Sequence, residues 1–280
     1  MKRFALVGYG RIGRVHEAAL ALVGADLAIV VDPPIGRPWP DRFEGIDAVV
    51  VATPTPTHAG VVADVRRRWS GPVLVEKPLS ASGSEVTALL RDPWVSGLYH
   101  AAFGAEVEWA ARRLASWGRP ESVEVALDDA YTPADDAESR LVGSWVDGGI
   151  NALSIVHRLL DVRRLGPLGT RTDLAGYQSF AGSFHGDGGA AVTVTTRWDQ
   201  PAAGKRTAVS FASGAALELD HLAMTGRLST DDGTLESFRA GRSPARLVQH
   251  YAAMYDHLAG HERLLALDVE LALHRLLVTD

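Results

Sequence analysis

The chain has 280 residues, 46% hydrophobic and 22% charged, a composition typical of a folded globular protein. The length favours two domains of similar size. A formal net charge of −6 argues against nucleic acid or an anionic membrane as a partner, because both attract basic surfaces. The lack of cysteine excludes disulfides, thiolate metal sites and a cysteine nucleophile. With neither a signal-peptide pattern nor a membrane-span pattern at its start, the sequence predicts a cytoplasmic protein.

Short apolar runs alternate with helical patterns over the first hundred residues, which indicates strand–helix–strand units and a parallel sheet. We expect strands over residues 4–7, 27–31, 48–52, 72–75 and 95–99. Helices are expected over residues 11–22, 57–69 and 84–91. Right-handed crossovers place the carboxyl ends of these strands on one edge, where ligands bind to open α/β sheets.

The pattern changes after a helical stretch over residues 105–117. Longer alternating runs with Gly-rich turns then indicate an antiparallel sheet, with strands over 122–127, 190–197, 207–211 and 215–219. Helical patterns cover residues 149–160, 245–258 and 269–277. We therefore predict two domains of the α/β class, residues 1–103 and residues 104–280.

The turn after the first strand reads Gly8-Tyr9-Gly10-Arg11-Ile12-Gly13 and opens a helix. Glycines at this spacing allow a tight turn, a close approach of pyrophosphate and close packing of helix on strand, and the helix N-terminus favours negative charge. The alternative is a Gly-rich turn in an α/β protein that binds no nucleotide. The order strand, loop, helix favours a dinucleotide site with Gly8, Gly10, Arg11, Ile12 and Gly13 as cofactor residues.

Asp32 ends the second predicted strand, nineteen residues after Gly13. A carboxylate there accepts hydrogen bonds from the adenosine ribose and repels a 2′-phosphate, which favours NAD. Arg37 follows closely and could meet that phosphate, so NADP stays open.

The turn after the third strand reads Thr53-Pro54-Thr55-Pro56-Thr57-His58. Thr55 or Thr57 can cap the next helix, so capping alone could explain the hydroxyls. His58 has two interpretations of equal weight, contact with the cofactor or packing at the helix start. We assign Thr53, Pro54 and His58 to the cofactor side of the crevice.

The fourth strand ends in Glu76-Lys77-Pro78, where the proline favours an extended backbone at Lys77. A lysine after a buried strand is ordinarily a surface ammonium. Beside a bound dinucleotide, partial desolvation and the positive nicotinamide would lower the Lys77 pKa and suit it to proton transfer. We therefore predict a catalytic Lys77, with Glu76 beside the cofactor.

In the second half, the stretch from Gly143 to Asn151 carries the densest set of functional side chains. Asp147 is predicted at a helix N-cap, and Asn151 follows one turn later, so both could face Lys77. Plain N-capping is the alternative for Asp147. The i, i+4 pair His257 and His261 has no third ligand in view, so we expect no metal site.

Taken together, these motifs resemble the Gfo/Idh/MocA family of oxidoreductases, over nearly the whole chain. The resemblance implies a Rossmann domain followed by an α/β domain with a large open, mostly antiparallel sheet. It also implies a catalytic lysine at Lys77 and a catalytic aspartate at Asp147. The family pattern has histidine where this chain has Asn151, and a carboxamide cannot take a proton. The proton would then fall to Lys77 or Asp147.

The stretch around Asn151 is similar to the bacterial L-arabinose/D-galactose 1-dehydrogenase branch of that family. In this branch the resemblance implies sugar contacts for His100 and Trp198, and we add Trp145 to the predicted substrate side. Tryptophan suits a sugar because axial C–H groups pack on its face, although core packing is the alternative for Trp198. The segment 128–143 departs from the branch, and Gly148 stands where the branch has proline.

These observations predict an NAD-dependent enzyme that oxidises an aldose at C1 to the lactone. The alternatives are a reductase of a keto-sugar or other carbonyl, which would use the same motifs, and a non-catalytic NAD-binding sensor. The family resemblance further implies a homo-oligomer formed through the open face of the second sheet, because a large apolar face is rarely left to water.

Overall fold

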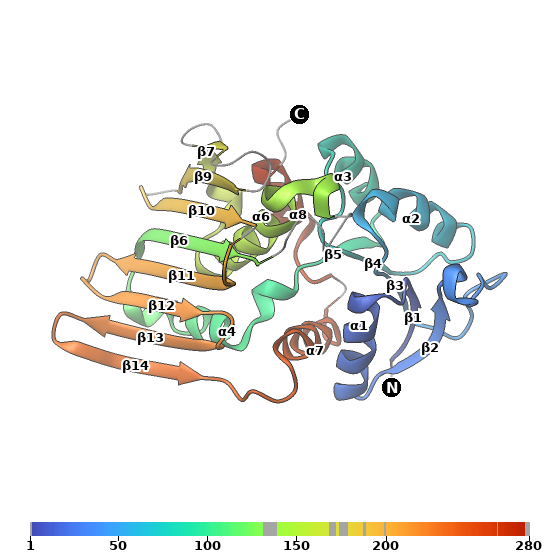
Figure 1. The fold of residues 1–280 in the computed structure, drawn as a ribbon, viewed down its shortest axis with the longest axis horizontal. Coiled ribbons are helices and arrows are strands. Elements are labelled where there is room, and N and C mark those ends of the chain that lie inside the picture. Colours follow the sequence, from blue (N-terminus) through green and yellow to red (C-terminus); the bar gives the residue numbers. More distant parts are fainter. Residues whose placement is uncertain are drawn as a thin grey trace. The chain divides into compact units, whose positions relative to one another are not determined.

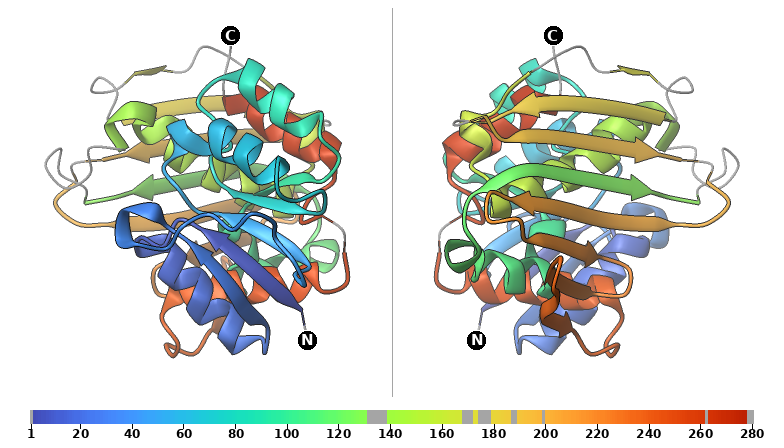
Figure 2. Two further views of the ribbon diagram at one scale, coloured as in Figure 1. Left: turned by 90° about the vertical axis from the view of Figure 1, so that its right-hand side faces the viewer. Right: turned by 90° about the vertical axis from the view of Figure 1, so that its left-hand side faces the viewer.

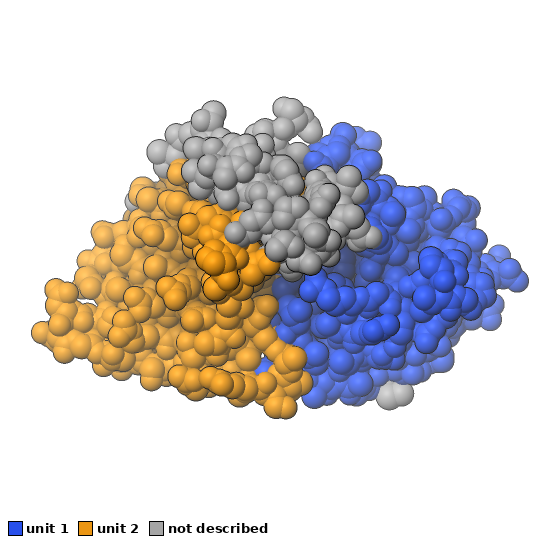
Figure 3. All heavy atoms as spheres, in the orientation of Figure 1, with its two compact units in different colours: residues 1–100, 247–271, 280 blue, residues 101–246, 272–279 orange. Residues whose placement is uncertain are grey.

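The computed structural model describes residues 2–130, 139–167, 172–173, 179–186, 189–198, 200–261 and 263–277. The chain divides into two compact units, which Figure 3 colours separately. Unit 1 comprises residues 1–100, 247–271 and 280, and unit 2 comprises residues 101–246 and 272–279. The predicted division placed everything after residue 103 in the second domain, whereas the segment 247–271 groups with unit 1.

Unit 1 is built on a parallel sheet of five strands in the order β2-β1-β3-β4-β5 (Figure 1). The strands are β1 (Arg3–Val7), β2 (Asp26–Val31), β3 (Ala48–Val51), β4 (Val73–Glu76) and β5 (Val95–Leu98). The strand order reverses direction beside β1, which puts the switch point between the carboxyl ends of β1 and β3. The predicted fold class is confirmed in this unit.

The core of unit 1 is rich in valine because parallel strands are covered on both faces. Val49, Val50 and Val51 of β3 are all inaccessible to solvent. The helices of the unit are α1 (Arg11–Leu22), α2 (His58–Arg66), α3 (Gly83–Leu90) and α7 (Arg246–Leu258). Ser82 caps α3 through a hydrogen bond from the Glu85 amide. The first three helices lie where their periodicity predicts them.

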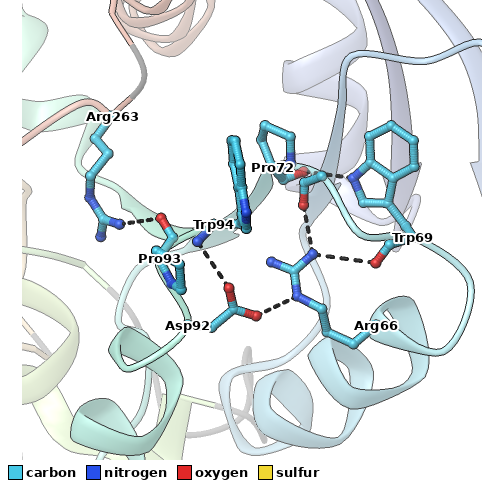
Figure 4. A network of polar contacts seen from close by, with 8 residues as sticks. Arg66, Trp69, Pro72, Asp92, Pro93, Trp94 and Arg263 are labelled. Atoms are coloured by element: carbon cyan, nitrogen blue, oxygen red, sulfur yellow. Dashed lines mark hydrogen bonds and ion pairs between the residues drawn. The ribbon is translucent and has the colours of Figure 1, made fainter.

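The amino ends of β4 and β5 are held by a network of polar contacts (Figure 4). The Arg66 guanidinium bonds the Asp92 carboxylate (Nε to Oδ2, 2.5 Å) and the carbonyl of Gly71 (2.6 Å). Asp92 also accepts a hydrogen bond from the Trp94 amide, and Arg263 donates to the Pro93 carbonyl. These bonds satisfy loop carbonyls that strand pairing leaves open.

The three arginines at residues 66–68 do not form one solvated face, because two of them pack against their own unit. Arg66 belongs to the network just described, and the Arg68 guanidinium lies 5.0 Å from the centre of the Trp39 ring. Only Arg67 is largely exposed, with 65% of its side chain accessible. Net charge and spacing cannot distinguish an arginine that binds carbonyls from one that faces water.

Unit 2 is built on a sheet of nine strands, in which β6 and β10 are parallel neighbours and every other pair is antiparallel. The path runs β14-β13-β12-β11-β6-β10-β9-β7, and β8 pairs with β9. The strands are β6 (Pro120–Asp128), β7 (Gly166–Pro167), β8 (Thr172–Asp173), β9 (Ser179–His185), β10 (Ala191–Arg197), β11 (Gly204–Phe211), β12 (Ala216–Asp220), β13 (Thr225–Thr230) and β14 (Gly233–Arg239). The predicted mostly antiparallel sheet is confirmed.

Helices cover one face of this sheet, as the right-hand view of Figure 2 shows from the uncovered side. They are α4 (Ala105–Ala111), α5 (Leu114–Trp117) and α6 (Ser139–Leu159), while α8 (Leu267–Leu277) spans the division between the units. Val123, Val125 and Leu127 of β6 alternate toward the helices and are buried. The sheet therefore has one apolar face and one face without helices.

The uncovered face is not the large apolar surface that the sequence led us to expect. It carries small and hydroxyl side chains, among them Ser122, Ala126, Thr193, Thr195, Ala208 and Ser210. Cross-strand ion pairs join Arg197 to Asp128 and Arg227 to Glu218, both at 2.7 Å. The described side chains on this face are largely small or polar.

Within the described residues, no helix has both the length and the apolar character needed to cross a membrane. The same part of the chain contains no cluster of three or more histidine, aspartate or glutamate side chains that could hold a metal ion.

Candidate functional site

The glycine turn lies at the switch point of the parallel sheet, and each of its glycines has a different steric reason. Gly8 has a φ of +95°, and a Cβ there would lie 2.6 Å from the Ala52 carbonyl oxygen. At Gly13 a Cβ would lie 2.3 Å from the Gly8 oxygen. Gly10, the N-cap of α1, has no such neighbour within 4 Å. The turn thus packs tightly at both ends and leaves open space above Gly10, as close approach of a pyrophosphate would require.

Arg11 and Ile12 form the first turn of α1 behind this space. Arg11 is exposed and Ile12 is half-buried. The helix begins at the predicted residue, so its amide groups point toward the glycine turn, as anion binding requires.

Asp32 follows β2 and is held against the same turn. Its Oδ2 accepts a hydrogen bond from the Tyr9 amide at 2.7 Å. The Arg37 guanidinium lies 4.4 Å from the centre of the Tyr9 ring, and the backbones of Asp32 and Arg37 pair with each other. Tyr9, which the sequence did not single out, therefore links the glycine turn to the loop expected beside the adenosine ribose.

His58 joins the loops that follow β3 and β4. The side chain is 1% exposed, its Nε2 lies 2.8 Å from the Thr53 oxygen, and its Nδ1 lies 3.1 Å from the Pro78 oxygen. Burial lowers the pKa of this imidazole, although the surrounding carbonyls oppose the shift. Both ring nitrogens are engaged by protein oxygens, which fits the packing interpretation of His58 better than contact with a cofactor. Thr53 and Pro54 are half-buried on the same edge.

Glu76, the last residue of β4, is buried, and Lys77, which follows it, is less so. Glu76 is 6% exposed, and its Oε1 accepts hydrogen bonds from the Tyr251 hydroxyl at 2.7 Å and from His16 at 3.0 Å. Lys77 is half-buried and joins Pro78 by a cis peptide bond. The Glu76 carboxylate therefore points into protein, and the residue that follows it stands at the ligand edge of the sheet.

In unit 2, Asp147 and Asn151 lie in the first part of α6. Gly143 has a non-helical φ of 71°, so the continuous helix starts after it and Asp147 lies within the first turn. The predicted N-cap position for Asp147 is wrong, because Gly143 lets the helix begin several residues earlier. The Asn151 amide donates weakly to the Asp147 carbonyl (3.5 Å). Its Oδ1 is buried and has no hydrogen-bond partner among the described residues.

Gly148 has a packing role in unit 2. A Cβ on Gly148 would lie 3.1 Å from the Thr196 methyl group, so α6 approaches β10 closely there. A Cβ on Gly149 would lie 2.8 Å from Leu277. The two glycines bring the start of α6, and with it Asp147, close to the sheet.

The predicted substrate residues differ in their surroundings. Trp145 is 2% exposed, donates its indole N–H to the Leu277 oxygen at 2.8 Å and stacks with Phe184. It offers almost no surface to a ligand and packs as a core residue of unit 2. Trp198 follows β10 and is 5% exposed. His100 follows β5 in unit 1, is 8% exposed and stacks on the Tyr251 ring.

The structure gathers the predicted cofactor residues, Lys77 and His100 on the carboxyl edge of unit 1. Asp147, Asn151, Trp145 and Trp198 belong to unit 2, and their pairing with Lys77 stays a prediction. Sequence reasoning missed Tyr251 and Tyr255 of α7, which meet the Glu76 network. Their i, i+4 spacing was visible, but nothing local indicated which strand end they reach.

No family model matches the chain. The scyllo-inositol 2-dehydrogenase (NAD(+)) of Bacillus subtilis (strain 168) is 35% identical over 184 residues, covering 56% of this chain and 54% of that protein. The rhizopine catabolism protein MocA of Rhizobium meliloti is 34% identical over 99 residues, covering 30% and 31%. The chain thus spans about half the length of the first relative and about a third of the second.

A solved structure gives the fold over nearly the full length. An oxidoreductase from Agrobacterium radiobacter in complex with NAD+, L-tartaric acid and magnesium superposes with a TM-score of 0.77 at 17% identity, covering 99% of this chain and 94% of that one. Over these aligned parts the chain is similar to an inositol dehydrogenase and to MocA, and over nearly its full length it has the fold of a solved oxidoreductase.

Proposed function

We propose that this protein is an NAD-dependent dehydrogenase of the Gfo/Idh/MocA family that oxidises a ring CH–OH group of a sugar or cyclic polyol. The observation that carries the proposal is the carboxyl edge of unit 1, where open space above Gly10 and the half-buried Lys77 lie on the same edge of one sheet. Homology to an NAD-dependent inositol dehydrogenase supports the same reaction class.

The residues present fit NAD. Gly10 leaves room for pyrophosphate, the start of α1 offers amide groups, and the Asp32 carboxylate lies one hydrogen bond from the turn. NAD, when bound, supplies the hydride acceptor. The negative charge of Asp32 disfavours a 2′-phosphate, so we propose NAD rather than NADP.

On the substrate side, Lys77 and Asp147 share the task of removing the hydroxyl proton. Asn151 cannot take a proton, but its buried Oδ1 can accept a hydrogen bond from a sugar hydroxyl and hold the ring. Holding the reacting carbon in place is itself a large part of catalysis in such enzymes. His100 forms a further wall of the substrate site in this proposal.

Asn151 also bears on which hydroxyl is oxidised. The hydroxyl at C1 of an aldose is a hemiacetal hydroxyl, which is more acidic than an ordinary secondary alcohol and needs less help from a base. A site with asparagine in place of histidine suits that hydroxyl. Within the class we therefore propose oxidation of an aldose, galactose- or arabinose-like, at C1 to the lactone.

The test is NADH formation with a panel of aldoses and inositols. We expect turnover with an aldose, a lactone product trapped as its hydroxamate, and little turnover with NADP. Turnover with inositols alone, giving a ketone, would move the reaction to a secondary alcohol. Absence of NADH formation with every member, together with no NAD binding by calorimetry, would overturn the proposal.

We also propose a homo-oligomer formed through the uncovered face of the nine-stranded sheet. Small side chains such as Ala126 and Thr195 let the sheet of a second copy approach closely. Light scattering of the wild type and of Thr195→Arg tests this proposal, with loss of the oligomer expected in the variant. A monomeric wild type would contradict it.

A further inference from the structure

The Glu76 carboxylate is the centre of a buried polar network in unit 1. Its Oε1 accepts hydrogen bonds from both the Tyr251 hydroxyl and the His16 imidazole. His16 is inaccessible to solvent and Tyr251 is 1% exposed. A buried carboxylate is costly unless it is hydrogen-bonded, so these two donors fix its position.

The network continues through His16 to a second tyrosine. His16 Nδ1 lies 2.7 Å from the Tyr255 hydroxyl. Burial, and secondarily the charge of Glu76, raise the pKa of Tyr255 well above its ordinary value, so its hydroxyl keeps its proton. Tyr255 then donates to His16 Nδ1, and His16 Nε2–H donates to Glu76. The chain of donors runs from α7 through α1 to the end of β4.

Tyr251 has a second contact that Tyr255 lacks. Its ring stacks on His100, with centroids 4.9 Å apart and planes at 30°. One side chain of α7 thus touches the residue that precedes Lys77 and also His100, two residues after β5. These contacts explain why the segment 247–271 groups with unit 1.

We propose that Tyr251 is a positioning residue for catalysis: its hydroxyl, through Glu76, sets the place of Lys77, and its ring sets the place of His100. This inference rests on the proposed function for the roles of Lys77 and His100. Tyr251 touches no reacting atom itself, and its effect is on orientation. Misplacement of a catalytic group by about 1 Å can lower turnover about a hundredfold, so the effect is measurable.

The kinetic test compares three hydroxyl deletions. Tyr251→Phe removes the bond to Glu76 and keeps the ring on His100, while Tyr255→Phe removes the donor to His16 one step further away. Thr207→Val deletes a buried hydroxyl that bonds His221 in unit 2 and serves as the stability control. We expect kcat to fall about tenfold in Tyr251→Phe, less in Tyr255→Phe, and to stay within about twofold in Thr207→Val.

A fourth variant separates the two contacts of Tyr251. Tyr251→Leu removes the stacked ring as well as the hydroxyl, so we expect the KM for sugar to rise in addition to the loss of kcat. The KM for NAD should stay the same in both Tyr251 variants, because the glycine turn is untouched. Equal losses of kcat in all three hydroxyl deletions would reduce Tyr251 to a stability role.

Position can also be measured without turnover, because the chain has only three lysines, Lys2, Lys77 and Lys205. Reductive methylation with ¹³C gives three separate dimethyl-lysine signals, and Lys205, held by Asp129 at 2.7 Å, is the internal reference. Tyr251→Phe should move the Lys77 signal and leave the Lys205 signal in place. An unmoved Lys77 signal would overturn the positioning role, whereas a wild type without turnover would overturn the proposed function instead.

Discussion

The two edges of the parallel sheet in unit 1 use their side chains in opposite ways. At the amino edge, Arg66, Asp92 and Arg263 bond loop carbonyls and amides of their own unit. At the carboxyl edge, Gly10 faces open space. Glu76 and His58 of the same edge are buried and hydrogen-bonded to protein atoms. Polar groups that hydrogen-bond to one another stabilise the amino edge. At the carboxyl edge, the residues expected to meet a ligand are left accessible, and buried hydrogen-bonded groups hold them in place.

The largest effect should come from the carboxyl edge. Lys77→Met removes the proton-transfer group and should lower kcat by at least about a hundredfold, because general acid–base catalysis contributes that much or more. Stability should change far less than kcat, since Lys77 is only half-buried. NADH formation and thermal unfolding measure the two quantities.

Lys205→Met is the matched control for charge and side-chain length. Lys205 pairs with Asp129 in unit 2 and has no predicted role in the reaction. A loss of activity in this control as large as in Lys77→Met would contradict the assignment of Lys77.

Two alanine substitutions in the glycine turn separate an effect on NAD binding from an effect on stability. At Gly10 the new Cβ meets nothing within 4 Å and the backbone φ of −74° is ordinary, so Gly10→Ala should fold normally and bind NAD at least about tenfold more weakly. At Gly13 the Cβ would overlap the Gly8 oxygen, so Gly13→Ala should lose about 1–3 kcal/mol of stability.

Calorimetric NAD titration and denaturant unfolding of both variants provide the measurement. Tight NAD binding by Gly10→Ala would mean that the open space above this residue is not where pyrophosphate lies.

The sequence predicted most of unit 1 because its signals are local. The glycine turn, Asp32 and the start of α1 follow from residues within one strand–helix unit, and the structure has α1 at the predicted bounds. In unit 2, β13 and β14 were not identified, because Thr, Gly and Ser dilute their apolar alternation. Strand pairing then decides the structure, and a single sequence does not display it.

The residues of the candidate site that are expected to meet the ligands were predicted, whereas the buried residues that hold them in place were missed. Lys77 and Asp32 have motif neighbours that identify them. Tyr251 bonds Glu76 across 175 positions of sequence, a relation that no local pattern carries. Trp145 shows the reverse error, because a tryptophan in a motif-rich stretch suggested a sugar contact, whereas its indole is enclosed by Phe184 and Leu277.

The amino edge should respond in stability alone. Arg66→Met removes a charged hydrogen bond to Asp92 and the bond to the Gly71 carbonyl, which should cost about 1–3 kcal/mol of unfolding free energy. The kcat should stay the same, because this network lies at the opposite edge from Lys77. Arg67→Met, which alters a mostly exposed neighbour, is the control and should stay within about 0.5 kcal/mol. A change of kcat in Arg66→Met without a change in stability would contradict the division between the edges.

The smallest effect concerns the pH dependence of stability at the carboxyl edge. Burial lowers the folded-state pKa of His58 below its ordinary value of 6.5. Above that pH, His58 is neutral in both states and its contribution is complete. As the pH falls below 6.5, the unfolded chain binds the proton first, so stability is lost until the folded state also takes it up.

His58→Gln keeps a donor near the Thr53 oxygen but does not titrate, so its unfolding free energy should fall less steeply between pH 6.5 and the lower pKa than that of the wild type. The remaining histidines are the same in both proteins and cancel in the comparison. Parallel curves from urea unfolding at several pH values would show that the three carbonyls facing the ring, those of Thr53, Pro78 and Leu79, offset its burial completely.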